Sequence, residues 1–130
     1  LFCASLCDYD QFLCEDSGKS RILESLELFD FAINSPYFEN SSFVLFLNKK
    51  DLFAEKIKVS PLESYFDDYH GGADFDNAKN FILSKYLSLN HSNRVIYKYF
   101  TCATDTRMME VIFDVIEENI LMKSLDFVIG

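Results

Sequence analysis

Three short runs of strand-forming apolar residues divide the chain, and they cover residues 1–6, 43–47 and 95–100. The middle run, Phe-Val-Leu-Phe-Leu, shows no alternation of apolar and polar positions. Such continuity is typical of a strand that is covered on both faces. The pattern therefore predicts three strands, of which the middle one is buried.

Between and after these runs, apolar residues recur three and four positions apart, which predicts helices. The three stripes consist of Ile22, Leu26, Phe29 and Ile33; of Phe75, Ala78, Phe81, Ile82, Tyr86 and Leu89; and of Met108, Ile112, Val115, Ile116 and Ile120. Asn34-Ser35-Pro36 ends the first helix, and Asp74 is the expected N-cap of the second. Ser60-Pro61 and His70-Gly71-Gly72 mark a loop, with a possible short helix, between the second strand and the second helix.

The order of these elements predicts an α/β fold, in which right-handed βαβ units build a parallel three-stranded sheet flanked by helices. Ligands of such sheets bind at the carboxyl ends of the strands. The chain opens directly inside the first apolar run. We therefore expect the first strand to present an unpaired apolar edge, and the chain to be part of something larger.

The composition narrows the range of possible functions. The 130 residues are 49% hydrophobic with four Gly and two Pro, which predicts one compact domain. No apolar run is long enough to span a membrane, and residues 1–3 lack the features of a signal peptide. Twelve basic and 21 acidic residues give a net charge of −9, which disfavours polymeric nucleic acid and anionic membrane surfaces as partners. A single nucleotide in a local pocket is compatible with this charge.

The cysteines and histidines do not form a metal-binding pattern. Cys3, Cys7, Cys14 and Cys102 lack paired C-x-x-C spacing, and His70 and His91 are not at ligand spacing from any of them. We interpret the cysteines as buried thiols and expect no metal site.

Gly18-Lys19-Ser20 matches the end of a phosphate-binding loop, but the match is incomplete. Such a loop also needs a glycine five positions earlier, where the backbone turns tightly around the anion. Position 13 is Leu. We interpret the tripeptide as a chance match.

The end of the second strand carries the clearest chemistry, in Asn48-Lys49-Lys50-Asp51. The Asp51 carboxylate can accept parallel hydrogen bonds from guanine N1–H and the exocyclic amine, a donor pair that adenine lacks. Asn48 can bond the major-groove edge of the base or brace the neighbouring loop. The aliphatic stem of Lys49 can lie across the ring.

The end of the third strand, residues 100–106 with the sequence Phe-Thr-Cys-Ala-Thr-Asp-Thr, provides a second candidate loop. Ala103 is small enough for the backbone to approach a planar base, so that its N–H can donate to guanine O6. We predict that Cys102, Ala103 and Thr104 complete a guanine site with Asn48, Lys49 and Asp51.

With these motifs, the sequence resembles the alpha subunits of heterotrimeric G proteins over essentially its whole length. The segments that carry the resemblance are Phe46–Phe53, Lys56, Ser60–Leu62, Phe100–Thr106, Asp8–Asp10, Glu15–Asp16, Arg21, Glu24–Ser25 and Leu28–Asp30. The sequence departs from the family pattern at Ser20, at Asp67 and in the position of the last glycine, Gly130.

The resemblance implies that residues 1–130 are part of a G protein alpha GTPase domain, from its fourth strand to its carboxyl terminus, and resemble the second half of a P-loop (Ras-like) GTPase. The phosphate loop, the helical insert and the first two switches have no counterpart in this sequence, and Asp8–Arg21 resembles the third switch. The family implies GTP or GDP and Mg²⁺ as cofactors, with no Mg²⁺ ligand in this chain. It implies a beta-gamma dimer, receptors and effectors as partners, and a cytoplasmic location at the inner face of the plasma membrane. We expect no GTP hydrolysis by this chain alone.

A second hypothesis is a non-catalytic interaction module that binds a receptor or effector through its last helix. An apolar stripe continues from Phe113 towards Gly130 beyond the expected sheet. The receptor contacts expected under either hypothesis are Ile120, Leu121, Leu125, Phe127, Val128 and Ile129.

Overall fold

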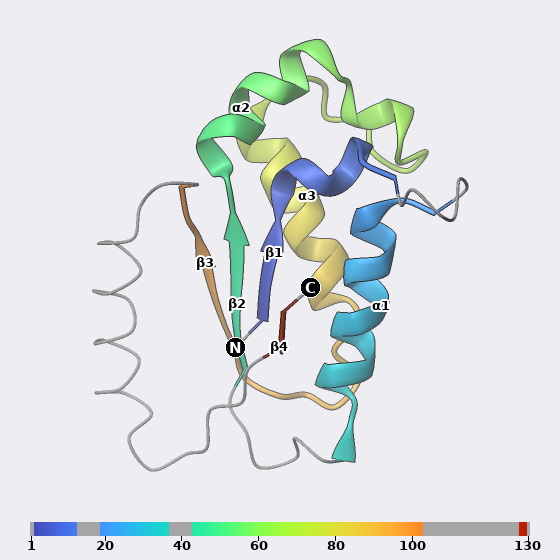
Figure 1. The fold of residues 1–130 in the computed structure, drawn as a ribbon, viewed down its shortest axis with the longest axis vertical. Helices are drawn as coiled ribbons and strands as arrows, with labels where there is room; N and C mark the ends of the chain where they lie inside the picture. The colour runs from blue at the N-terminus through green and yellow to red at the C-terminus, as the bar shows by residue number, and fades with distance from the viewer. Residues whose placement is uncertain (1, 13–18, 37–42, 103–127, 130) are drawn as a thin grey trace.

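A computed structural model describes residues 2–12, 19–36, 43–102 and 128–129 (Figure 1). Its sheet has the order β3-β2-β1-β4, and all neighbouring strands are parallel. The strands are β1 (Phe2–Ser5), β2 (Phe43–Asn48), β3 (Ile96–Phe100) and β4 (Val128–Ile129). The predicted α/β fold with three parallel strands is confirmed, and the structure adds the short β4 to it.

The strand β4 corrects the expectation of an unpaired first strand. Val128 pairs with Phe2, and Ile129 pairs with Cys3. Pairing satisfies backbone groups that an open sheet edge would leave to solvent. The expectation is therefore wrong at these two positions of β1. The other predicted receptor contacts, Ile120, Leu121, Leu125 and Phe127, lie outside the described residues, as does the helix predicted around residues 108–120.

The two other predicted helices are present as α1 (Arg21–Ile33) and α3 (Phe75–Leu87). The N-cap of α3 is Asp74, as predicted, and its carboxylate accepts from the Asn77 N–H at 2.8 Å. Ser20 caps α1 in the same way, accepting from the Leu23 N–H at 3.2 Å. The hydroxyl of the Gly-Lys-Ser tripeptide therefore starts a helix, which agrees with the interpretation of a chance match.

After the second strand we expected a loop with a possible short helix. The structure has there α2 (Lys50–Val59), a ten-residue helix, and the short 3₁₀ helix η3 (Leu62–Ser64). The buried face of α2 consists of only Phe53 and Ile57, so the hydrophobic pattern in its sequence is weak. A second difference is at the end of β1, where residues Leu6–Asp10 form the 3₁₀ helix η1 instead of continuing the strand. The Ser5 hydroxyl caps η1 by accepting from the Cys7 N–H at 3.2 Å.

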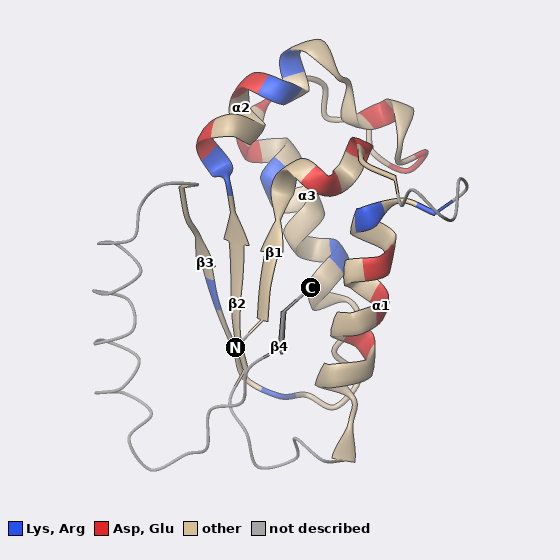
Figure 2. Cartoon of the chain, in the orientation of Figure 1, with Lys and Arg blue, Asp and Glu red and all other residues tan. Residues whose placement is uncertain are grey.

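The core lies between the sheet and the helices α1 and α3. Phe29 of α1 packs edge-on against Phe2 of β1 and Tyr86 of α3, with ring centroids 5.1 and 5.4 Å apart. All five apolar residues of β2, Phe43–Leu47, are buried, as predicted. Figure 2 shows that the charged residues of the described part lie mostly on helices and loops. Lys98, in β3, is an exception.

One buried hydrogen bond joins the two core helices, since the hydroxyls of Ser25 and Tyr86 lie 2.7 Å apart. Tyr86→Phe keeps the ring but leaves the Ser25 hydroxyl without this partner. We expect the free energy of unfolding in urea to fall by about 1 kcal/mol. Tyr65→Phe, at a tyrosine whose side chain is 39% exposed, is the control and should change it little. Equal losses in the two variants would contradict this account of the core.

Candidate functional site

The carboxyl ends of β2 and β3 are joined by hydrogen bonds. Leu47 pairs with Phe100 in the sheet register, so the next residues, Asn48 and Thr101, lie opposite each other. The buried Thr101 hydroxyl donates to Asn48 Oδ1 at 3.0 Å. The Thr101 backbone N–H donates to Leu47 O, and its carbonyl accepts from the Lys50 N–H, both at 3.0 Å. The two loops that the sequence predicts to read guanine are thus held together.

The contact with Thr101 also orients the Asn48 side chain. Because Oδ1 accepts from the Thr101 hydroxyl, the side-chain NH₂ of Asn48 is turned away from Thr101. Of the two roles considered for Asn48, bracing the neighbouring loop is the one seen in the structure. The amide NH₂ is the group that can donate to a base. Thr101 follows β3 directly and therefore lies opposite Asn48, a placement that no motif in the sequence indicates.

Lys49 makes the turn between β2 and α2 in an unusual conformation. Its φ of 66° and ψ of 35° lie in the left-handed region, which costs a residue with a side chain about 1 kcal/mol. Its carbonyl accepts from the Phe53 N–H at 2.9 Å and so begins the hydrogen-bond ladder of α2. The turn places Asp51 in the first turn of α2, where the positive end of the helix dipole favours a carboxylate.

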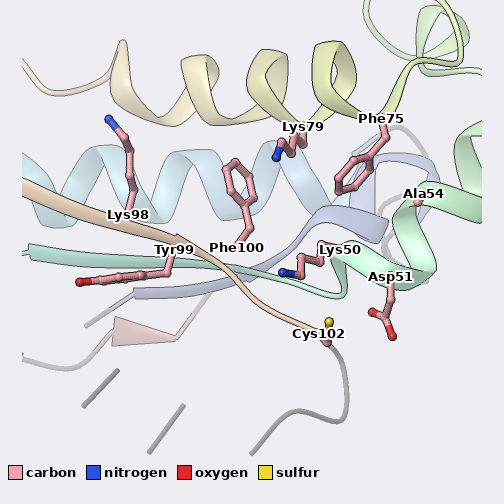
Figure 3. Close-up of a pocket in the computed structure, with 9 residues that line it drawn as sticks. All are labelled: Lys50, Asp51, Ala54, Phe75, Lys79, Lys98, Tyr99, Phe100 and Cys102. Atoms are coloured by element: carbon pink, nitrogen blue, oxygen red, sulfur yellow. The ribbon is translucent and has the colours of Figure 1, made fainter. Parts of the chain in front are cut away.

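A cavity of about 550 Å³ lies beside this turn, between α2, α3 and β3 (Figure 3). Its lining residues are Lys50, Asp51, Ala54, Phe75, Lys79, Lys98, Tyr99, Phe100 and Cys102. Of the predicted guanine-binding residues, Asp51 and Cys102 line the cavity, and Asn48 and Lys49 belong to the adjoining turn. Ala103 and Thr104 lie outside the described residues.

Lysines from three elements give the cavity positive charge within an acidic chain. The Lys79 ammonium lies 4.8 Å from the ring centroid of Phe100 and 5.0 Å from that of Phe75. It also pairs with Asp76 at 3.3 Å. Figure 3 shows Lys79, Phe75 and Phe100 close together, with Lys50, Asp51 and Cys102 below them and Lys98 and Tyr99 towards the left of the view. A ligand with a flat ring and negative charge suits this combination of aromatic and basic groups. Lys79 and Lys98 come from elements distant in sequence from the motif, so no local pattern indicates that they line the cavity.

The described cysteines are free thiols, and each of Cys3, Cys7 and Cys102 is only partly buried. Burial raises the pKa of the Cys3 and Cys7 thiols above the ordinary value, which keeps them protonated at neutral pH. Within the described ranges, no group of three His, Cys, Asp or Glu side chains is arranged to hold a metal ion.

No helix in the part of the chain that the structure describes is long and apolar enough to cross a membrane.

The fold and the site together define a class of protein: an α/β domain that presents polar side chains for a ligand at the carboxyl ends of parallel strands. Comparison with known families then identifies the family. The model of the G-protein alpha subunit family matches residues 1–120, and the chain belongs to this family. The resemblance found in the sequence is thereby confirmed, as is the likeness of the fold to part of a P-loop GTPase domain.

Several fungal proteins are similar to the chain over 96% of its length. It is 50% identical to the guanine nucleotide-binding protein alpha-2 subunit of Kluyveromyces lactis and 49% identical to that of Saccharomyces cerevisiae. It is 42% identical to the guanine nucleotide-binding protein alpha-1 subunit of Mycosarcoma maydis. The chain spans only 23%, 28% and 36% of the lengths of these three relatives. The alternative hypothesis of a separate interaction module finds no support in these comparisons.

The bond between Thr101 and Asn48 can be tested with a matched pair of variants. Thr101→Val keeps the shape of the side chain but removes the hydroxyl that bonds Asn48 Oδ1. We expect it to lower the free energy of unfolding by about 1 kcal/mol, whereas Thr101→Ser keeps the hydroxyl and should lose less. Urea denaturation followed by circular dichroism measures both. A larger loss for Ser than for Val would show that packing of the methyl group dominates at this position.

Proposed function

We propose that this chain is the guanine-reading part of a G protein alpha subunit and belongs to its GTPase domain. The observation that carries the proposal is the joining of the ends of β2 and β3 by Thr101 and Asn48, next to Asp51 at the start of α2. A base that enters there meets a carboxylate, an amide donor and a lysine stem, all attached to rigid elements.

The donor and acceptor pattern of these groups fits guanine better than adenine. The Asp51 carboxylate accepts from guanine N1–H and the exocyclic amine. The Asn48 NH₂ is directed away from Thr101 and donates to the major-groove edge of the base. The stem of Lys49 covers one face of the ring. Cys102 lines the cavity beside the turn. For Ala103 and Thr104, which follow it in the sequence, the prediction stays that the Ala103 N–H can donate to guanine O6.

The ligand proposed for this site is the base of GTP or GDP. The described side chains do not fit Mg²⁺, because no three acidic or histidine ligands gather among them, and we assign the metal no step. We also expect no phosphate release from GTP by this chain alone, because hydrolysis depends on a phosphate loop and on switch residues that its sequence does not contain. We further propose that a beta-gamma dimer, receptors and effectors are partners, and that they meet the protein at the inner face of the plasma membrane. This part of the proposal is based on membership of the family.

The decisive experiment substitutes Asp51 and compares nucleotides. Asp51→Asn turns an acceptor of two hydrogen bonds into a mixed donor and acceptor, so we expect GDP binding to weaken by about 2 kcal/mol, roughly 30-fold. Binding of xanthosine diphosphate should improve relative to GDP, because xanthine replaces the exocyclic amine by a carbonyl. Ligand-observed NMR on the purified chain detects weak binding and suits both measurements.

The matched control is Glu55→Gln, which removes the same charge from an exposed position of the same helix. It should leave the preference between the two nucleotides unchanged. A preference that stays the same in Asp51→Asn would refute the assignment of Asp51 to the base.

A further inference from the structure

The helix α2, which carries Asp51 in its first turn, is attached at its far end to η1. The Tyr9 hydroxyl donates to the Ser60 carbonyl at 2.6 Å, and the Ser60 hydroxyl donates to Asp10 Oδ2 at 3.1 Å. The ring of Tyr9 packs edge-on against Phe53 on the buried side of α2, with centroids 5.7 Å apart. These contacts join η1 to α2.

Lys56 is the centre of this attachment. Its ammonium lies 2.5 Å from Asp10 Oδ1 and donates to the Cys7 carbonyl at 2.9 Å. The side chains of Lys56 and Asp10 are only 23% and 13% exposed. Charges that are partly shielded from water interact more strongly than a surface pair, and removing one leaves the other poorly solvated.

The same segment also contacts the guanine-reading turn directly. The Cys7 thiol donates to the Lys49 carbonyl with Sγ 3.8 Å from the oxygen. Lys49 has the left-handed conformation, and its carbonyl is the group that starts the α2 ladder through Phe53. Cys7 thus contacts Lys56 with its carbonyl oxygen and the turn with its thiol.

The pKa of Asp10 favours the ion pair with Lys56 at neutral pH. Burial alone would raise the pKa of the Asp10 carboxyl, but hydrogen bonds from Lys56, Gln11 and Ser60 outweigh burial and lower the pKa below its ordinary value. A group whose pKa is lowered by folding stabilises the fold above its unfolded pKa, about 3.9 for Asp, and loses that effect as the pH falls through the lowered value. The ion pair is therefore intact at neutral pH.

We propose that Lys56 and Asp10 are positioning residues for the guanine-reading turn, and that they hold Asn48–Asp51 in its binding geometry by fixing η1 against α2. The assignment rests on the proposed function, because it concerns the same base-binding site.

Amide hydrogen exchange of the full chain at pH 7 tests the proposal without a ligand. The reporting amides are those of Lys50, which bonds Thr101 O, and Phe53, which bonds Lys49 O. In Lys56→Met and Asp10→Asn, we expect their protection to fall about fivefold or more beyond any fall in β2. Lys58→Met is the matched control, because Lys58 lies on the same helix and pairs at the surface with Glu55. It should leave both amides unchanged, and Lys56→Arg, which keeps charge and donors, should retain most of the protection.

Two results would overturn the proposal. The first is a loss of protection at Lys50 and Phe53 that is no larger than the loss in β2. Lys56 would then stabilise the fold as a whole and would not position the turn. The second is a GDP affinity that is unchanged in folded Lys56→Met while the parent chain binds GDP. If the parent chain binds no guanine nucleotide, the proposed function fails, and the exchange data still decide whether Lys56 positions the turn.

Discussion

The buried central strand β2 is the constraint on which the rest of the described structure depends. Its five apolar residues are shielded from water, and it pairs with β1 on one edge and β3 on the other. The register of these pairs places Ser5 of β1 beside Asn48. Thr101, which follows Phe100 of β3, lies on the other side of Asn48. Because η1 begins after Ser5 and α2 begins after Lys49, burial of β2 brings η1, the turn and the second loop to one edge of the sheet.

The turn at that edge is held from two sides. Thr101 bonds Asn48 and Lys50 from the side of β3, and Cys7 contacts the Lys49 carbonyl from the side of β1. These contacts offset the cost of the left-handed conformation of Lys49, about 1 kcal/mol. The turn is thus held by contacts with both neighbouring segments, η1 and the end of β3.

Sequence patterns predicted the elements with strong local signals. β2 is a continuous apolar run, and α1 and α3 combine long stripes with the side-chain caps Ser20 and Asp74. The helix α2 was expected only as a possible short helix, because Phe53 and Ile57 alone form its buried face. The pairing of β4 with β1 joins opposite ends of the chain, and no local pattern encodes it. The motif Asn48–Asp51 was found from its chemistry, but the roles of Thr101, Cys7 and Lys56 depend on long-range contacts that spacing does not reveal.

The most direct test of the account is a titration of the isotopically labelled chain with GMP and with AMP, followed by the backbone amide resonances. The account predicts that GMP shifts the amides of residues 48–51 and 101–102 in a saturable way and that AMP at the same concentration does not. Equal responses to the two nucleotides, or shifts confined to residues away from these two strand ends, would contradict the claim that the ends of β2 and β3 read guanine.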